Sequence, residues 1–322
     1  MSSAQMDGLP NTQAMQIAPT IQRTLKAPID CVGVGLHSGR RVRLGLLPAP
    51  AGTGIVFRRT DLGVDIPARY GNVVDSRLCT VIGPEGDPSA RVGTVEHLMA
   101  ALVGAGVHNA IIEIDGPEVP IHDGSAASFL FLIDCAGVVE QDEFMASIEV
   151  LRPVRVVHGE AFAELRPFPL GFDMSVSIAF DAAAIGRQAL TLRLTPESFR
   201  AELARARTFT LASEVAQLRA AGLALGGSLD NAVVVDGARV LNPGGLRMGD
   251  EFVRHKLLDA VGDLAMAGAP LLGRFIGHRT GHALNNRLLR ALFADVANWR
   301  LLPAPLEAMP AMAWQRRETA AA

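Results

Sequence analysis

Two segments that lie far apart in the chain carry the residue types of one metal site, and the fold must bring them together. The first contains Glu96-His97, and the second contains His255 and Asp259. Residues at i and i+4 of a helix share a face, so His255 and Asp259 can bind one cation from adjacent turns while Lys256 points elsewhere. The third ligand must come from another element, and His97 is the candidate.

Three protein ligands leave a coordination position open for water, which distinguishes a catalytic zinc site from a closed structural one. Glu96 is adjacent to a ligand without being needed as one. It can therefore take the proton of the metal-bound water as a general base.

A carboxylate and a histidine extend this pattern. Asp263 lies at i+8 from His255, on the predicted ligand face one turn further on. It could orient a histidine and raise its pKa, which would keep the imidazole cationic at neutral pH. His282 follows this helix and an intervening strand, so it can reach back and serve as the acid.

An isolated His-xxx-Asp pair is more often a solvated couple on a helix surface. Here the surrounding helix face is apolar, and an unpaired charge on such a face is expensive. The apolar neighbours are Phe252, Val253, Leu257, Leu258, Val261 and Leu264.

The first half of the chain reads as strands followed by a helix, a strand and a helix. Residues 24–57 alternate like strands, and a helix is predicted to begin with Thr94 as its N-cap and to end at Gly104 or Gly106. A strand at 108–116 and an apolar helix at 125–135 follow.

The second half repeats this order. Strands are predicted within 148–180 and at 230–237 and 271–277, and helices at 196–205, 213–221, 251–267 and 282–296. The predicted strand at 230–237 is similar in sequence pattern to the strand at 108–116, so we expect the two to be equivalent. If the halves are duplicates packed layer against layer, the helix of His97 can face the helix of His255. Similar strand-helix units also recur by chance in α+β proteins, so this pattern leaves both explanations open.

Composition excludes several classes of partner. The chain has 322 residues, 49% hydrophobic and 20% charged, with a net charge of -3 and a pI near 6.2, and it contains no long basic run. We expect no nucleic-acid partner and no transmembrane segment. The three cysteines form no CxxC pair, which favours a cytoplasmic protein without a disulfide framework. We predict a disordered lead at 1–20, domains at 21–144 and 145–302, and a flexible tail at 303–322.

With these residues identified, the chain closely resembles the UDP-3-O-acyl-N-acetylglucosamine deacetylase family, the zinc amidases of lipid A synthesis in Gram-negative bacteria. The resemblance covers nearly all of residues 21–300. It rests on a set of motifs: Gly33-Val34-Gly35-Leu36-His37-Ser38-Gly39, Thr94-Val95-Glu96-His97-Leu98, Pro120-Ile121-His122-Asp123-Gly124-Ser125, Arg205-Ala206-Arg207-Thr208-Phe209, Asp250-Glu251-Phe252-Val253-Arg254-His255-Lys256 and Gly281-His282-Ala283-Leu284-Asn285-Asn286.

The resemblance implies an α+β fold of two similar domains, with helices sandwiched between two outer sheets and the site at the junction. It implies one Zn²⁺ per chain, or Fe²⁺ in its place, held by His97, His255 and Asp259. Glu96 would be the base, His282 the general acid, Asp263 its partner, and Thr208 the hydroxyl that helps to hold the oxyanion.

The resemblance also implies an acylated UDP-amino-sugar as substrate, bound by a monomer. Residues 211–228 would form an apolar passage for the acyl chain, although an amphipathic core helix would show the same stripe. Ala179 stands where an acidic residue is expected beside the uracil contact at Phe180. The implied substrate contacts are Lys256, Phe180, Phe209, Val215, Gly227 and Ser228.

Two other functions use the same residue types. Two histidines and one carboxylate with open positions also describe the non-haem Fe(II) oxygenases. A non-catalytic nucleotide-sugar binding protein could keep the same cluster as a structural element. Activity without oxygen, and its response to chelation, would separate these alternatives from a zinc hydrolase.

Overall fold

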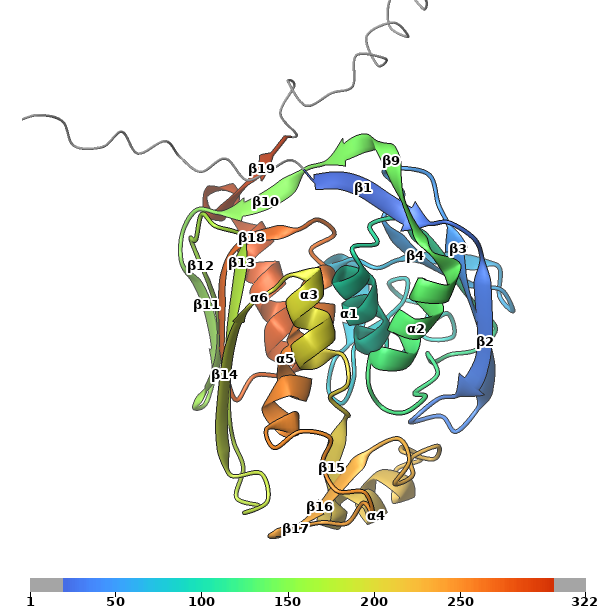
Figure 1. Ribbon diagram of the computed structural model, residues 1–322, viewed down its shortest axis with the longest axis vertical. Coiled ribbons are helices and arrows are strands. Elements are labelled where there is room, and N and C mark those ends of the chain that lie inside the picture. Colours follow the sequence, from blue (N-terminus) through green and yellow to red (C-terminus); the bar gives the residue numbers. More distant parts are fainter. Residues whose placement is uncertain (1–19, 304–322) are drawn as a thin grey trace, which may run out of the picture.

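The computed structural model describes residues 20–303 as two outer β-sheets with helices packed between them (Figure 1). This arrangement confirms the predicted α+β class and the predicted sandwich of helices. Nearly all of the predicted lead at 1–20 and tail at 303–322 lies outside the described residues.

The first sheet has the strand order β2-β3-β8-β4-β5. In β3, Val42, Leu44 and Leu46 are buried while Arg41 and Arg43 face solvent, as the alternation in the sequence predicts for a strand with one covered face. The bounds are β2 (Ile29–Val34), β3 (Arg41–Pro48), β4 (Ile55–Arg59), β5 (Val64–Pro67) and β8 (Ala110–Ile114).

The second sheet contains the run β11-β12-β18-β13-β14, and β10 and β19 extend it beside β18. In each five-stranded run one pair of inner strands is parallel, β4 with β8 and β13 with β18, and the other pairs of the run are antiparallel. The two halves therefore share one topology. Outside the run, β10 also pairs with β18 in parallel. The bounds are β10 (Ser147–Val150), β11 (Val154–His158), β12 (Ala161–Arg166), β13 (Phe172–Ala179), β14 (Arg187–Arg193), β18 (Leu271–His278) and β19 (Trp299–Leu302).

The shared topology corrects one expectation. The strand predicted at 230–237 is not the counterpart of β8. It forms β16 (Val233–Asp236), which belongs to a small separate sheet with β15 (Phe209–Leu211) and β17 (Arg239–Val240). The counterpart of β8 is β18. A short apolar run between polar residues fits either sheet, so local sequence did not identify the equivalent strand.

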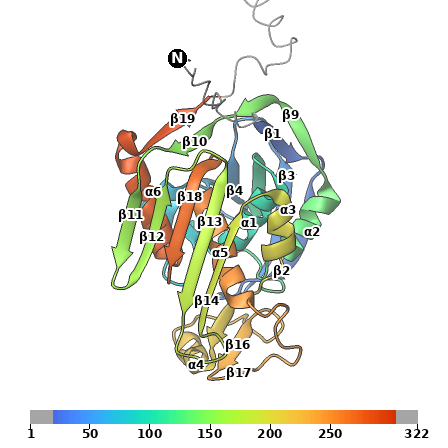
Figure 2. The ribbon, with the colours of Figure 1, turned by 60° about the vertical axis from the view of Figure 1, so that its left-hand side comes forward.

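Four helices fill the space between the sheets (Figures 1 and 2). They are α1 (Glu96–Ala105), α2 (Ala127–Ala136), α5 (Glu251–Ala265) and α6 (His282–Ala294). Helix α1 precedes β8 and α5 precedes β18, so α1 and α5 are the equivalent helices, and they pack against each other. The two similar halves therefore pack layer against layer with their equivalent helices in contact, as the fold implied by the resemblance requires.

The start of α1 differs from the predicted N-cap at Thr94. The helix begins at Glu96, and Thr94 has a φ of 56°. Its hydroxyl donates to the Glu118 carboxylate at 2.9 Å instead of capping the helix. A buried acceptor outside the helix thus overrides the local capping preference.

The remaining elements are shorter or pair outside the two five-stranded runs, and the segment 196–203 packs against α1 with Phe199 and Leu203 fully buried. Strands β1 (Thr20–Leu25) and β9 (Val138–Met145) pair across one end of the sandwich, and β6 (Val73–Asp75) pairs with β7 (Val81–Ile82). The helix predicted at 196–205 is a short α3 (Pro196–Ser198) followed by a π-helical turn (Phe199–Leu203). Helix α4 (Ala212–Ala220) lies beside the small sheet (Figure 1).

The chain passes from β9 to β10 between Met145 and Ser147, beside the predicted domain boundary. The division into domains at 21–144 and 145–302 stays a prediction. Between residues 20 and 303, no helix is both long and apolar enough to cross a membrane.

Candidate metal centre

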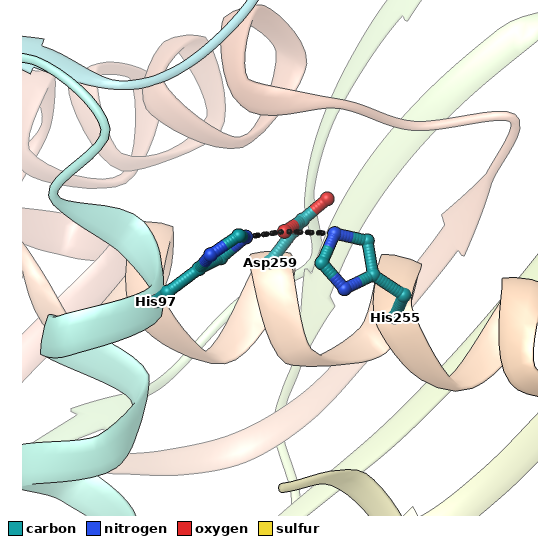
Figure 3. Close-up of side chains that lie close together, drawn as sticks. All are labelled: His97, His255 and Asp259. Carbon is teal, nitrogen blue, oxygen red and sulfur yellow. Dashed lines mark ion pairs between the residues drawn. The ribbon is translucent and has the colours of Figure 1, made fainter. Parts of the chain in front are cut away.

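Three buried side chains from the two halves converge where α1 crosses α5 (Figure 3). The Nε2 atoms of His97 and His255 lie 3.5 and 3.3 Å from the same oxygen, Oδ1 of Asp259. One donor atom from each of the three residues lies within 4.8 Å of the others. The structure thus brings together the predicted ligand set, which could hold a metal ion.

The proton positions around His255 favour a cation at this point. Burial lowers the pKa of His255 to about 3, so the imidazole is neutral and has a single N–H. Its Nδ1 lies 3.0 Å from the Ala206 carbonyl oxygen, which can only accept, so the proton is on Nδ1. The lone pair of Nε2 therefore faces a carboxylate oxygen.

Two lone pairs at this separation repel unless a positive charge lies between them. Within the described residues, Asp259 Oδ1 has no hydrogen-bond donor and is buried. Ligands of a tetrahedral Zn²⁺ lie about 3.4 Å apart, given metal–ligand distances near 2.1 Å. The observed separations of 3.3 and 3.5 Å fit that geometry, so the residues present suit a divalent ion.

A glycine in α5 allows the two helices to approach this closely. A Cβ atom added at Gly262 would lie 2.0 Å from the carbonyl oxygen of Glu96. Any larger residue would push the first turn of α1, with His97, away from Asp259. The signal in the sequence is a glycine inside a helix whose neighbours are otherwise apolar, and the sequence analysis did not use it.

The expectation that Lys256 points elsewhere is wrong. Its Nζ donates to Oδ2 of Asp259 at 2.9 Å, because residues at i and i+3 are also neighbours on a helix and the lysine stem is flexible. Burial alone would raise the pKa of Asp259, but the adjacent Lys256 ammonium holds it well below its usual range. Lys256 therefore occupies one carboxylate oxygen and leaves the other to the histidines.

Beside the triad lies a second cluster, formed by Glu96, His282 and Asp263. His282 Nδ1 lies 3.1 and 3.0 Å from the two oxygens of Asp263, and its Nε2 lies 3.8 Å from Oε1 of Glu96. Burial opposes a charge on this ring, yet Asp263 and then Glu96 raise the pKa of His282 to about 10. His282 is thus an imidazolium at neutral pH, as its predicted pairing with Asp263 requires.

Glu96 is 3% exposed, and burial raises its pKa above the usual value for glutamate. Its Oε2 accepts the backbone N–H of Thr80 at 3.0 Å. A carboxylate in this state is a stronger proton acceptor than one in water. The structure therefore places a proton acceptor and a proton donor side by side next to the ligand triad.

The sequence analysis missed two residues that hold this second cluster. The Thr80 hydroxyl donates to Oδ1 of Asp263 at 2.5 Å, and the Asn285 amide donates to Oδ2 at 2.8 Å. Asn285 was visible in the motif that contains His282. Thr80 follows a glycine-free polar loop, and no pattern around it points to the site.

The loop that precedes β15 also borders the triad. The Ala206 carbonyl accepts from His255, and Arg207 forms a buried ion pair with Glu251 at 2.8 Å. Thr208 is two residues beyond Ala206, with backbone hydrogen bonds to Gly124 and Val233. These contacts tie Thr208 to both halves of the molecule near the triad.

Three predicted substrate contacts lie together next to His255. The Phe180 and Phe209 rings meet edge to face at 5.5 Å, and Lys256 Nζ lies 5.5 Å from the centre of the Phe209 ring. A cavity of about 360 Å³ is lined by Phe180, Asp181 and Lys256 among others. Asp181 is the acidic neighbour of Phe180, on the other side from Ala179.

Comparisons with known proteins agree with this geometry. A family-wide sequence model described as LpxC, UDP-3-O-acyl N-acetylglycosamine deacetylase, matches residues 22–294. The UDP-3-O-acyl-N-acetylglucosamine deacetylase of Acidithiobacillus ferrooxidans is 53% identical over 285 residues, 87% of this chain and 92% of that protein. The protein of the same name from Shewanella frigidimarina is 48% identical over 291 residues, 89% of this chain and 94% of that protein.

The chain belongs to the UDP-3-O-acyl-N-acetylglycosamine deacetylase family. The resemblance found in the motifs is thereby confirmed. The ligand triad and the cluster of Glu96, His282 and Asp263 both lie within the residues that match the family.

In this family member, helix α4 and the loop after it carry the remaining predicted contacts. Val215 is half-buried, and α4 has no fully buried residue, so its apolar stripe is not part of the core. Gly227 and Ser228 lie in the loop after α4, where Leu225 and Gly226 hydrogen-bond to the carbonyls of residues 37 and 36. The segment thus contacts the first half of the chain beside His37.

A larger cavity lies elsewhere. It measures about 550 Å³, is mostly apolar, and is lined by the C-terminal parts of α1 and α5 together with β1. None of the predicted site residues lines it. Size alone therefore does not select a candidate site, whereas the converging donor atoms and shifted pKa values point to one.

Proposed function

We propose that this chain removes acetate from the 2-N-acetyl group of UDP-3-O-acyl-N-acetylglucosamine, the committed step of lipid A biosynthesis. Its relatives carry that activity in their names and match about nine-tenths of the chain. The observation that carries the proposal is the meeting of a three-ligand cluster with a buried carboxylate and a buried imidazolium.

We propose His97, His255 and Asp259 as ligands of one Zn²⁺, with Fe²⁺ as the alternative ion. A divalent ion bound there would lower the pKa of a bound water from about 16 to near 7 and polarise an amide carbonyl. Lys256 keeps Oδ2 of Asp259 occupied, which directs Oδ1 toward the histidines.

The side chains around the triad supply the proton transfers. Glu96 accepts a proton from the water that attacks the acetamide carbon, since its buried carboxylate has a raised pKa. The Thr208 hydroxyl donates a hydrogen bond to the oxygen that becomes negative. As the C–N bond breaks, His282, or Glu96 with the proton it has gained, protonates the amine, and acetate leaves.

The substrate would lie across both halves of the molecule. We propose that Lys256, Phe180 and Phe209 contact the UDP-sugar in the cavity next to His255, and that Val215, Gly227 and Ser228 border the acyl chain beside α4. The half-buried stripe of α4 supports this assignment, because an apolar face outside the core suits an alkyl chain. We further propose a monomeric cytoplasmic enzyme.

The test combines metal content with acetate release from the acylated UDP-sugar. We expect about one Zn²⁺ per chain, loss of acetate release on chelation, and recovery when Zn²⁺ is added. The reaction should proceed in an anaerobic chamber without a 2-oxoacid, which a non-haem oxygenase could not do. Binding of the UDP-sugar without any acetate release would refute the proposal.

A further inference from the structure

Thr80 contacts two buried carboxylates beside the triad, those of Glu96 and Asp263. It is 2% exposed and directly precedes β7. Its backbone N–H donates to Oε2 of Glu96 at 3.0 Å, and its hydroxyl donates to Oδ1 of Asp263 at 2.5 Å. One residue therefore contacts both the carboxylate base and the carboxylate that pairs with His282.

The backbone of Thr80 is itself anchored to the start of α1. Its carbonyl oxygen accepts the N–H of Val95 at 3.3 Å, next to Glu96. Asp263 lies on α5, and His282 begins α6. Thr80 thus joins the first turn of α1 to the two helices of the other half, at the point where the proton donor and acceptor face each other.

The two contacts of Thr80 act on different groups. Through its backbone it fixes one oxygen of Glu96 and leaves Oε1 on the side of His282. Through its side chain it fixes Asp263, whose other oxygen is held by the Asn285 amide at 2.8 Å. With both oxygens held, Asp263 cannot turn away from the His282 ring.

We propose that Thr80 is a positioning residue that holds Asp263 against His282 while its backbone holds Glu96, and so sets the alignment of the acid with the base. The catalytic consequence rests on the proposed function, but the alignment of His282 does not. Because Thr80 is buried and contacts Glu96 and Asp263, it acts through these two carboxylates.

Two substitutions at Thr80 distinguish the effect of losing the hydroxyl donor from the effect of changing the volume of the side chain. Thr80→Val keeps the volume and the backbone N–H to Glu96 but removes the donor to Asp263. Thr80→Ser keeps the donor and loses one methyl group. Thr24→Val is the matched control, because the Thr24 hydroxyl is also buried and hydrogen-bonded but donates to the Asn109 carbonyl, away from the cluster.

The first readout is the steady-state kinetics of the zinc-loaded, full-length protein. Removal of a group that orients a catalytic residue typically costs 10- to 100-fold in activity. We expect Thr80→Val to lose about that factor in kcat with KM within about 3-fold, and Thr80→Ser and Thr24→Val to stay within about 3-fold of the wild type. Equal kcat values in Thr80→Val and the wild type would overturn the proposal.

The second readout is the ¹⁵N NMR titration of the His282 ring in histidine-labelled protein, assigned with His282→Gln. The groups that face this ring are Asp263, Glu96 and Asp259, and His37 lies near it. We expect the midpoint of His282 to fall by about one pH unit in Thr80→Val and to stay within about 0.3 units in Thr80→Ser. An unchanged midpoint in Thr80→Val would count against the proposal whatever the kinetics show.

These outcomes keep the two hypotheses apart. If the wild type releases no acetate, the proposed function fails, and the NMR titration still decides whether Thr80 aligns Asp263 with His282. If the wild type is active and the valine variant matches it in both readouts, the proposed function stands and the role of Thr80 is rejected. Thermal melting of all variants checks that each one folds.

Discussion

Two buried histidines lie in neighbouring helices of this protein and differ in charge. His255 in α5 is neutral, with its pKa lowered to about 3, whereas His282 at the start of α6 is cationic, with its pKa raised to about 10. Each lies close to an aspartate of α5, Asp259 for His255 and Asp263 for His282. Burial and a nearby carboxylate are common to both.

The difference lies in what else surrounds each pair. His255 uses its one N–H on a backbone carbonyl, and Asp259 is already paired with Lys256. His282 points its Nδ1 at both oxygens of Asp263, and Glu96 adds a second negative charge. The different partners in the buried site therefore make His255 a candidate ligand and His282 a candidate acid, although both are histidines.

We expect the largest loss of activity from a substitution at Glu96, which lies beside both histidine sites. Glu96→Ala should keep its metal, because Glu96 is not among the three converging ligands, but should lose about 10²- to 10⁴-fold in kcat, the usual contribution of a general base. Metal analysis and acetate release on the same preparation measure both. A variant that retains most of its activity would refute the base assignment.

His282→Gln tests the cationic side of the contrast. The pKa of His282 is raised from 6.5 to about 10, so the stability from its charge is complete below pH 6.5, declines above it, and is lost as the pH rises through about 10. We expect the variant to lose about 100-fold in kcat and to show a melting temperature that falls less than the wild type's between pH 6.5 and 10. Parallel melting curves for the two proteins across that range would contradict the charge assignment.

Gly262→Ala tests whether both clusters depend on one helix contact. The added methyl group would lie 2.0 Å from the Glu96 carbonyl, so α1 must move and stability should fall by roughly 1–3 kcal/mol. Metal affinity and kcat should fall together, since His97 and Glu96 move as one turn. Gly249→Ala is the control, because a Cβ there meets no atom within 4 Å, and denaturant unfolding of both variants measures the difference.

Lys256→Gln is expected to have the smallest effect. It tests the site of the neutral histidine, His255, through its partner Asp259. Removal of the cation frees Oδ2 of Asp259 and raises the pKa of that carboxyl toward its usual range. We expect roughly 10-fold weaker metal binding. A competition titration with a chelating dye checks this, and Lys26→Gln, on the exposed surface, is the matched control. Unchanged affinity would mean that Lys256 serves the substrate alone.

Much of this site was predictable because its residues occur at the spacing of regular structure. His255, Asp259 and Asp263 are separated by four residues each in an apolar helix, and α5 is buried on nearly all sides, as that pattern indicates. The alternation in β3 likewise identified its buried face. The motifs around Glu96, His97 and His282 pointed to the family that the comparisons confirm.

Other features depend on contacts between residues far apart in the chain, and local patterns gave wrong or no answers there. Thr94 looks like a helix cap but donates to Glu118, 24 residues away. The strand at 230–237 looks like the counterpart of β8 but pairs in another sheet. Thr80 carries no pattern, because its two partners are sixteen and 183 residues away.

The sequence by itself determined the residue types, the helical spacing on α5 and the membership of the family, since these follow from local periodicity and motif content. Only the tertiary structure decided which histidine is neutral, which is charged, and which oxygen of Asp259 faces both imidazoles. Those properties arise from burial at the junction of the two halves and from the hydrogen bonds made there, and that burial requires α1 and α5 to pack at Gly262.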